Sequence, residues 1–562
     1  MKKNIHQKWV FPSVENEAVL KLSKEAGISE FISKILIARG IKEAENAKKF
    51  LQAPLSSLPR PHIMKNMEAG VDLVKDSILK KRKIAVYSDY DADGISSAAI
   101  LTDFLKKMDC NFVTILANRF GYGYGIGIEE ARKISDEGAK CAIIADCGTS
   151  DFDAISYLKS KGIKTIVIDH HRPHSQLPPA EALINPLQTG CDFPAKELTA
   201  SGICFYFIAM LARKLETLKK VPDPRDYLDF AAIGTVCDIA PMIGANRCIV
   251  RHGGKRVLSS KRPAFKKMLT SMGITSGKLP EEIIARHISP KLNAPGRMTD
   301  ALPALEFLLS NNEDEANRLY SIIAEYDEKR KQEAKRVEEE ARFELTKKVL
   351  KDRASIILYK KGWHPGVLGI VANKILEYTG LPSGIIGIEN GIGRGSLRAP
   401  DGMDIFTPLS KISGIFERMG GHSFAVGFTI KSKKIPILEE IFEKVCSKIP
   451  QNKEEIKIDT DLDLEELDWH HLEECERLAP FGSQNPPPVI IIKDMNVVEA
   501  KIANPVHLKG KVKKGEKSLS VIGFNLADHI EDFKNSTSIV GNLRRNFFGG
   551  EYSIELLLID FK

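Results

Sequence analysis

KIAVYSDYDADGISS (residues 83–97), CAIIADCGTS (141–150) and KTIVIDHHRP (164–173) are the stretches that decide the fold of this 562-residue chain. Each begins with a short apolar run of strand length and then turns acidic or histidine-rich. Strands alternating with helices predict an α/β domain built on a parallel sheet. Another apolar run and three helical patterns occupy Phe112–Ala117, Ile95–Met108, Glu129–Glu137 and Asp153–Lys161.

The residues that follow these runs are expected to meet at one edge of the sheet, because ligands of an open parallel sheet bind beyond the carboxyl ends of its strands. Taken singly, each aspartate fits an ordinary turn or helix N-cap, and Asp93 before Gly94 fits that role well. Taken together, the clusters predict a site. They comprise Asp89, Asp91 and Asp93, then Asp146, then Asp169, His170 and His171, and finally Asp238 in GTVCDIAP (234–241), near the end of an apolar helix.

Such a site is expected to bind divalent cations. Carboxylates held close together repel one another unless a cation neutralises them or some take up protons. A ligand set of carboxylates with one or two imidazoles and no thiolate suits Mn²⁺ or Mg²⁺ better than structural zinc. Five or more candidate ligands exceed what one ion usually takes from protein. We therefore expect two ions that share a bridging carboxylate and act together on a phosphoryl group.

The composition is that of a globular chain of several domains. Hydrophobic residues make up 43% and charged residues 28%, and no stretch approaches the roughly 18 apolar residues of a membrane helix. The nine cysteines form no C-x-x-C pair, which favours a reducing, cytoplasmic location without membrane association. The net charge of +8 permits a polyanionic partner without requiring one.

The remaining segments differ in pattern. Residues 1–55 look like short helices, whereas 312–350 are dense in opposite charges at i, i+4 spacing and predict a long solvated linker helix. Residues 351–450 open with the apolar strand SIILYK and predict a second α/β domain. Residues 451–562 predict a small β-barrel, with a single-strand-binding OB-fold as the leading candidate. Its six expected strands are Val489–Ile492, Asn496–Ile502, His507–Val512, Leu519–Phe524, Ser538–Leu543 and Tyr552–Phe561.

The motifs resemble those of a known superfamily. YSDYDADGISS, ADCGTS, IDHHRP and GTVCDIAP resemble the four motifs of the DHH phosphoesterases. Passages that resemble the RecJ exonuclease branch include NRFGYGYGI (118–126), SPKLNAPGRMTDA (289–301), WHPGVLGIVANKI (363–375), RMGGHSFAVGF (418–428) and APFGSQNPPP (479–488). This resemblance implies a DHH catalytic domain over 56–311, joined by the linker helix to a smaller DHHA1 domain, followed by the OB-fold. Ser88 stands where the family usually has glycine.

The resemblance also implies an activity. It predicts a 5′→3′ exonuclease that hydrolyses single-stranded DNA with two Mn²⁺ or Mg²⁺ ions, acts in DNA repair and recombination, and works with a helicase and a single-strand-binding protein. One alternative is a superfamily enzyme that hydrolyses pyrophosphate, short oligoribonucleotides or cyclic dinucleotides. The predicted barrel and the chain length argue against it. Another alternative is a non-catalytic nucleic-acid-binding subunit, against which the retained acidic motifs argue.

Residue roles follow from the same resemblance. Asp89 and Asp91 match ligands of the two ions, Asp146 a bridging carboxylate, and His170 and Asp238 further ligands. His171 matches a group beside the ligands or facing phosphate, and Asp169 one that orients its neighbours.

Other residues are candidates for contacts with DNA. In GIGRGSLRAP (391–400), Gly395, Ser396 and Arg398 match a phosphate-contacting stretch, as do Gly421 and His422 in GGH (420–422), although glycine turns alone are common. Arg119 and Arg297 are candidates for backbone phosphates. Phe120, Tyr122 and Tyr124 either stack on bases or pack in a loop. The basic stretch His507, Lys509, Lys511, Lys513 and Lys514 either follows a DNA strand or guards a sheet edge.

Overall fold

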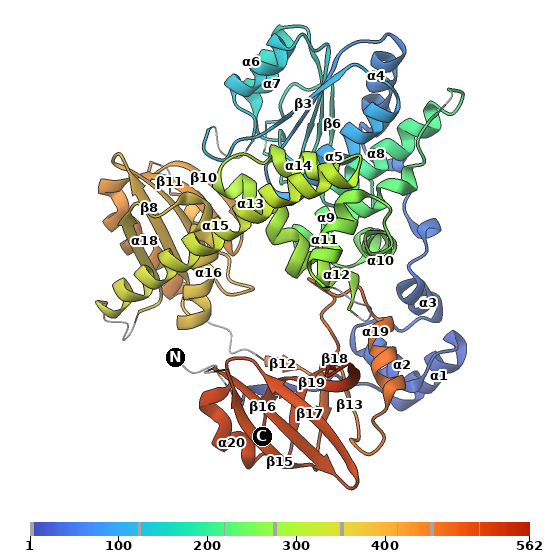
Figure 1. Cartoon of the computed structure of the whole chain (residues 1–562), viewed down its shortest axis with the longest axis vertical. Helices are drawn as coiled ribbons and strands as arrows, with labels where there is room; N and C mark the ends of the chain where they lie inside the picture. Colours follow the sequence, from blue (N-terminus) through green and yellow to red (C-terminus); the bar gives the residue numbers. More distant parts are fainter. Residues whose placement is uncertain are drawn as a thin grey trace. The chain divides into compact units, whose positions relative to one another are not determined.

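The structure, a computed structural model, describes residues 5–121, 125–174, 176–218, 220–273, 278–348, 353–412, 414–449, 455–504 and 506–562 (Figure 1). The chain divides into a large unit of residues 2–293, 301–320 and 454–562 and a small unit of residues 294–300 and 321–453. Within the described ranges, no helix combines the length and apolar character needed to cross a membrane.

The predicted parallel sheet forms the centre of the N-terminal α/β part of the large unit. Its strands are all parallel and stand in the order β3 (Phe112–Leu116), β2 (Ile84–Ser88), β4 (Cys141–Ala145), β5 (Lys164–Ile168) and β6 (Ala182–Ile184). Ser88 pairs with Ala145, and Ala145 pairs with Ile168. The three acidic motifs therefore begin at the same level of one sheet edge.

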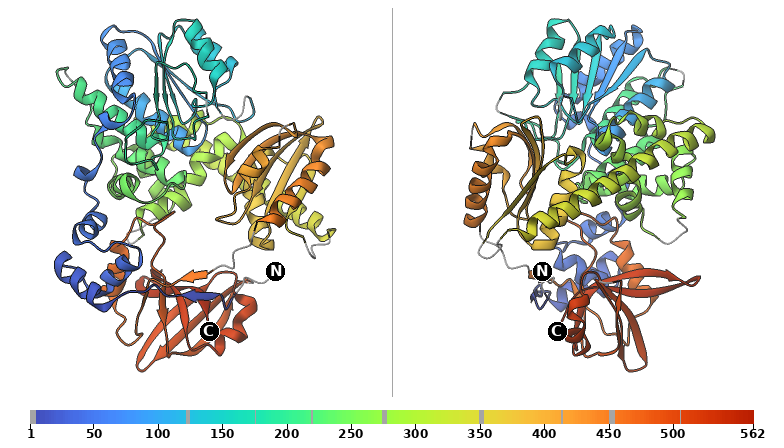
Figure 2. Two further views of the ribbon diagram at one scale, coloured as in Figure 1. Left: turned by 180° about the vertical axis from the view of Figure 1, so that it is seen from behind. Right: turned by 60° about the vertical axis from the view of Figure 1, so that its left-hand side comes forward.

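Helices cover both faces of this sheet (Figures 1 and 2). One face carries α4 (Met67–Leu79), α5 (Ala92–Lys107) and α8 (Ala200–Lys214), and the other carries α6 (Ile128–Asp136) beside α7 (Phe152–Ser160). Helix α5 is buried along most of its length, because it packs against β2 and β3 as well as against α8 and α9 (Leu228–Cys237). This burial explains its apolar composition and fixes the turn from β2 into α5.

Further helices follow α9. They are α10 (Gly244–Leu258), α11 (Pro263–Ser271), α12 (Pro280–Ile283), a π-helical turn at Ile284–Ile288, α13 (Ser289–Met298), α14 (Leu302–Leu308) and the long helix α15 (Glu313–Thr346). Helix α15 confirms the predicted charged helix, and its 34 residues span about 51 Å. Asp327 is buried on α15 and pairs with Arg330 and Lys331.

The small unit contains the second α/β domain. Its sheet has the order β10 (Phe416–His422), β11 (Ala425–Lys431), β9 (Ile392–Arg398), β8 (Ser383–Glu389) and β7 (Ile356–Lys361). Strands β7 and β8 are parallel, whereas the other neighbours are antiparallel. Its helices are α16 (Leu368–Thr379), α17 (Phe406–Ser410) and α18 (Ile435–Lys448).

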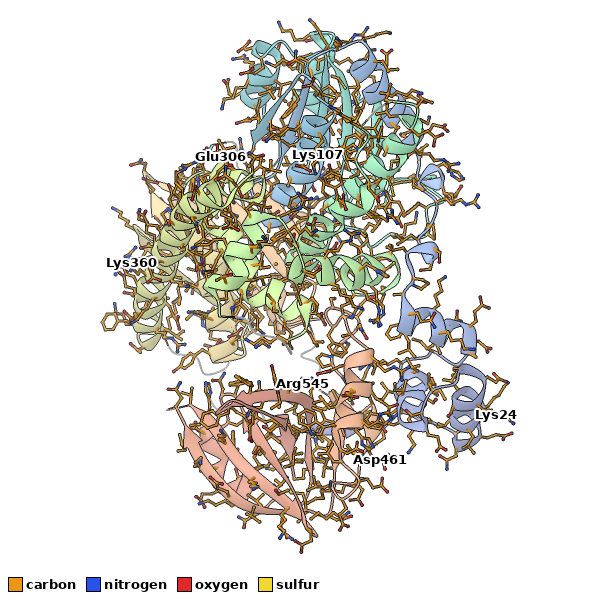
Figure 3. All side chains as sticks on the ribbon, turned by 45° about the vertical axis from the view of Figure 1, so that its right-hand side comes forward. Lys24, Lys107, Glu306, Lys360, Asp461 and Arg545 are labelled. Atoms are coloured by element: carbon orange, nitrogen blue, oxygen red, sulfur yellow. The ribbon has the colours of Figure 1, made fainter. Side chains whose placement is uncertain are left out.

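The C-terminal β-domain belongs to the large unit. Strands β14 (Ile490–Ile492), β15 (Asn496–Ala503), β16 (His507–Lys514), β17 (Lys517–Gly523), β18 (Ile539–Phe548) and β19 (Glu551–Phe561) form at the six predicted places. With β13 (Thr460–Asp461), their order is β13-β14-β18-β19-β17-β16-β15. Helices α19 (Trp469–Arg477) and α20 (Ile530–Lys534) accompany them, and Arg545 on β18 pairs with Glu476 of α19 (Figure 3).

The N-terminal segment contains the predicted short helices, α1 (Asn16–Ala26), α2 (Glu30–Ala38) and α3 (Ala44–Gln52). It also contains a strand that the sequence pattern does not reveal, β1 (Lys8–Val10), which pairs in parallel with β12 (Glu455–Lys457). Asp560 near the end of β19 is fully buried and accepts hydrogen bonds from the backbone N–H groups of His6 and Gln7 and from Nε1 of Trp9. The first strand is therefore held by the last domain.

Candidate metal centre

The turn after β2 presents two carboxylates. Asp91 caps α5, because its Oδ1 accepts hydrogen bonds from the N–H groups of Asp93 (3.0 Å) and Gly94 (3.1 Å). Asp89 is 2% exposed, and its Oδ1 has no hydrogen-bond partner among the residues that the structure describes. A Cβ at Gly94 would collide with the backbone oxygen of Asp89, so the turn requires glycine there. A buried carboxylate oxygen without a partner is costly, and a cation would supply the missing contact.

Ser88 strengthens this turn. Its Oγ donates to the carbonyl oxygens of Gly94 (2.7 Å) and Ala145 (3.2 Å). The serine thus joins the end of β2 both to the first turn of α5 and to the end of β4, which a glycine at this position could not do.

Asp146, His170 and Asp238 converge from three different elements. Asp146 follows β4 with a left-handed backbone (φ +60), and its N–H donates to the carbonyl of Ile168 (2.9 Å). Nε2 of His170, after β5, lies 3.4 Å from Oδ1 of Asp146 and 3.8 Å from Oδ2 of Asp238. Asp238 is the C-cap of α9.

The ligand atoms form three overlapping groups in which all atoms lie within 4.8 Å of one another. Because two groups contain Asp146 and two contain His170, the five predicted metal ligands form one continuous cluster. The groups are Asp89, Asp91 and Asp146; Asp146, His170 and His171; and Asp93, His170 and Asp238.

The electrostatics of the cluster favour a bound cation. Burial raises the pKa of Asp89, Asp146 and Asp238 well above the usual value for aspartate, and neighbouring carboxylates raise each of them further. Among these carboxylates, Asp91 makes the largest contribution to the raised pKa of Asp89 and to that of Asp146. Without a cation, some of these groups must take up protons. The donor set of carboxylate and imidazole fits Mn²⁺ or Mg²⁺.

Asp169 positions His170 and His171 through hydrogen bonds. Its Oδ1 accepts hydrogen bonds from both of their backbone N–H groups, at 2.7 Å for His170 and 3.1 Å for His171, and lies 2.7 Å from Nδ1 of His171. Its Oδ2 accepts from the N–H of Thr149 (3.0 Å). Burial alone would raise the pKa of Asp169, but the adjacent His171 holds it below the usual value. Burial alone would lower the pKa of His171, but Asp169 raises it to about 9.

Asp93 does not cap α5, as the sequence suggested, but accepts hydrogen bonds from another helix. The capping residue of α5 is Asp91, whereas Asp93 is buried and reaches the first turn of α8. There its Oδ2 accepts from the N–H of Ala200 (2.9 Å) and its Oδ1 from the N–H of Ser201 (3.1 Å). A Cβ at Gly234 would collide with Asp93, so α9 packs closely over it. Burial raises the pKa of Asp93 to about 6.

Ile239, directly after Asp238, adopts a left-handed backbone (φ +56) although its side chain is β-branched. It follows the C-cap of α9: its N–H donates to Val236 (3.2 Å), and the N–H of Ala240 donates to Thr235 (3.3 Å). Glycine is usual at this position, and other residues adopt this conformation at a cost of about 1–2 kcal/mol. The Ile239 side chain is 76% exposed, so core packing does not offset the strain.

The small unit brings most of the candidate phosphate-binding residues together. Ala425 on β11 pairs with His422 on β10 and with Arg398 on β9, so these residues lie side by side across three strands. Nη1 of Arg398 donates to Oγ of Ser396 (2.6 Å), and burial lowers the pKa of Arg398 to about 10. Gly421 adopts φ +144, where a Cβ would collide with the carbonyl oxygen of Ala425. Gly395 faces the ring of Phe428, which leaves no room for a side chain.

The other candidates have separate surroundings. The guanidinium of Arg119 lies 4.2 Å from the ring centroid of Tyr90, and its charge offsets part of the rise that burial and Asp91 cause in the pKa of Asp89. Arg297, in the small unit, donates from Nη1 to the carbonyl of Gly366 (3.3 Å). The N–H of Phe120 donates to Asn118, whereas Tyr122 and Tyr124 lie outside the described residues.

The basic stretch of the C-terminal domain lies entirely on β16, which is paired with β15 on one side and β17 on the other. These side chains therefore do not guard a sheet edge. Lys514 pairs with Asp463 (2.7 Å).

Known proteins resemble this chain throughout its length. Family models match at residues 83–235 (DHH family, N-terminal domain), 352–448 (DHHA1 domain) and 458–560 (RecJ OB domain). The single-stranded-DNA-specific exonuclease RecJ of Bacillus subtilis is 30% identical over 98% of this chain and 70% of its own length, and that of Escherichia coli is 27% identical over 95% and 96%. The crystal structure of Thermus thermophilus RecJ in complex with Mn²⁺ is similar with a TM-score of 0.83 and 25% identity, over 99% of this chain and 79% of that one.

The parallel sheet, with carboxylates and imidazoles gathered at its carboxyl edge, defines a protein of the DHH class. The DHHA1 and OB domains that follow confirm the predicted architecture. The chain belongs to the RecJ family of single-stranded-DNA-specific exonucleases.

Proposed function

We propose that this protein is a metal-dependent exonuclease that hydrolyses single-stranded DNA in the 5′→3′ direction. The observation that carries the proposal is the continuous cluster of carboxylates and imidazoles around Asp146 and His170. The cluster includes the buried Oδ1 of Asp89, which has no hydrogen-bond partner within the described part of the chain. Relationship to the RecJ exonucleases, together with the OB domain at residues 458–560, supports a long single strand as the substrate rather than a small phosphate ester.

Five side chains would hold two divalent ions: Asp89, Asp91, Asp146, His170 and Asp238. When bound, such ions supply Lewis-acid activation of water and neutralise the charge that develops on the phosphoryl oxygens. Asp169 fixes both histidine backbones and the Nδ1 side of the His171 ring. The ring of His171, held in this way beside Asp146 and His170, is proposed to face the substrate phosphate.

Arg398 and Ser396 are proposed to bind a phosphate of the DNA. The half-buried Arg398 has no carboxylate within ion-pair distance among the described residues, and its pKa is lowered by desolvation alone. A phosphate would provide the missing counter-charge and match the guanidinium fork. Gly421 and His422, next to Arg398 across β11, would let the backbone approach the same phosphate. Arg119 and Arg297 are proposed to contact other backbone phosphates.

The cellular setting is also a proposal. A single-strand exonuclease needs duplex DNA to be opened, so we propose a helicase and a single-strand-binding protein as partners in DNA repair and recombination in the cytoplasm.

The test is digestion of single-stranded DNA labelled at either end, with Mn²⁺, with Mg²⁺ and with chelator. We expect metal-dependent release of mononucleotides from the 5′ end, with blunt duplex spared. In parallel, Asp146→Ala should abolish hydrolysis and retain binding of the strand. Release from the 3′ end would refute the polarity, and hydrolysis of dinucleotides alone would move the protein to the small-substrate branch.

A further inference from the structure

Ile239 is unusual within this chain. Among the residues that the structure describes, it is the only β-branched residue with a left-handed backbone. The other non-glycine residues in that conformation are His, Ala, Asn, Lys, Asp and Gln. Branching at Cβ makes this region of backbone conformation especially unfavourable. Exposed single aliphatic side chains are common, but a strained one is not.

The same hydrogen-bond pattern ends other helices of the chain, where the residue with positive φ is one that adopts this conformation with less strain. After α4, Lys81 donates to Ile78 while the next N–H donates to Ser77, which is the pattern of Ile239 after α9. Gly162 after α7 and Asp109 after α5 make the equivalent first bond, and both have positive φ. The fold thus accepts glycine, aspartate or lysine at this position, so helix termination does not explain isoleucine.

The location of Ile239 suggests the explanation. It directly follows Asp238, so their Cα atoms are about 3.8 Å apart. Asp238 belongs to the metal-ligand cluster, with its Oδ2 3.8 Å from Nε2 of His170. Asp146, also in the cluster, is left-handed too (φ +60). Strained backbone that the rest of the structure holds in place is characteristic of functional sites.

We propose that the side chain of Ile239 packs against the nucleobase of the nucleotide whose phosphate lies at the metal cluster. An aliphatic side chain offers no hydrogen bonds, so the contact would tolerate any base, as a sequence-independent nuclease requires. The apolar face of a base is available in an unstacked single strand but is covered by stacking in a duplex. Ile239 would therefore position the substrate and also favour single strands. This inference rests on the proposed function of the same site.

The first test compares Ile239→Gly with the wild type for degradation of 5′-labelled single-stranded DNA in Mn²⁺. We expect KM to rise about ten-fold, equivalent to about two methylene groups of lost contact, with kcat changed less than two-fold. The melting temperature should be unchanged or higher, because glycine removes the strain. Lys81→Gly, at the matched position after α4, should leave KM and kcat unchanged.

The second test uses the same oligonucleotide with an abasic 5′-terminal nucleotide. For the wild type, KM should be about ten-fold higher on this substrate than on normal DNA. For Ile239→Gly, KM should be the same on both substrates. The inference is overturned if Ile239→Gly matches the wild type on normal DNA, or if it loses the same factor as the wild type on abasic DNA. Failure of the wild type to degrade any single strand would instead refute the proposed function, so the two failures are distinguishable.

Discussion

Replacing Arg247 by methionine should destabilise the large unit by about 2–4 kcal/mol. Arg247 lies on α10, is 2% exposed, and stacks on the ring of Phe50 at 3.8 Å. Its guanidinium donates to four backbone carbonyls: Phe50 in α3 and Leu478, Ala479 and Pro480 after α19. One side chain thus joins the N-terminal helices, the catalytic region and the approach to the C-terminal β-domain.

The loss of stability in Arg247→Met depends on which hydrogen-bond donors each of the four carbonyls keeps. Leu478 and Pro480 still accept from Nδ2 of Asn485, and Ala479 still accepts from Arg251. Within the described residues the Phe50 carbonyl is left without a donor, since the residue four positions on is Pro54 and has no N–H. One unsatisfied carbonyl costs about 1–3 kcal/mol, and loss of the cation–ring contact adds about 1 kcal/mol.

The assay is urea-induced unfolding followed by tryptophan fluorescence, with Arg256→Met as the control. Arg256 lies on the same helix, but its ion pair with Asp226 is exposed, so its loss should cost less than about 0.5 kcal/mol. If Arg247→Met is as stable as Arg256→Met, or more stable than the wild type, the reasoning is refuted. The cost of burying the charge would then match or exceed the value of its four hydrogen bonds.

Five further outcomes are expected. Asp146→Asn should reduce metal-dependent hydrolysis by at least about 1,000-fold, and calorimetry should show weakened Mn²⁺ binding. Without metal, thermal stability should fall as pH rises from about 4 through neutral: the raised pKa of Asp89 and Asp146 means that the folded state binds their protons more tightly, and this contribution is lost as those groups ionise. Saturation with Mn²⁺ at 100 times its dissociation constant should add about 2.7 kcal/mol, and a melting temperature independent of Mn²⁺ would argue against the site. Arg398→Lys should raise KM for DNA about ten-fold with little change in kcat, because an ammonium lacks the guanidinium fork; an equal KM would remove Arg398 from the phosphate site. Gly94→Ala should lower both melting temperature and activity, since its Cβ would collide with Asp89; a fully active, stable variant would show that the turn can relax.

Local signals in the sequence were sufficient to predict the sheet and the meeting of the acidic and histidine motifs at one of its edges. The apolar runs before Asp89, Asp146 and Asp169 are short and sharply bounded, so their strand character and common edge follow from pattern alone. The long helix α15 likewise follows from its ladder of opposite charges. These features depend on neighbouring residues or on a general rule about parallel sheets.

Features that depend on distant partners could not be predicted in this way. Asp93 looks like a local N-cap, and its hydrogen bonds to Ala200 and Ser201 require knowledge of where α8 begins relative to β2. The role of Arg247 requires three segments to meet, and the left-handed backbone of Ile239 is unexpected for its residue type. In each case the residue's hydrogen-bond partners or backbone conformation depend on the tertiary structure, and the local sequence pattern does not reveal them.

The pairing of β1 with β12 has a consequence for synthesis of the chain. Lys8 and Glu455, which pair at the start of these strands, are separated by 447 positions. At a translation rate of 5–20 residues per second, roughly 20–90 s pass between the synthesis of β1 and the synthesis of its partner β12. Asp560, which anchors the same segment, emerges later still. During that interval an unpaired strand edge and Trp9 stand exposed in the nascent chain, where chaperones that recognise such segments have time to bind.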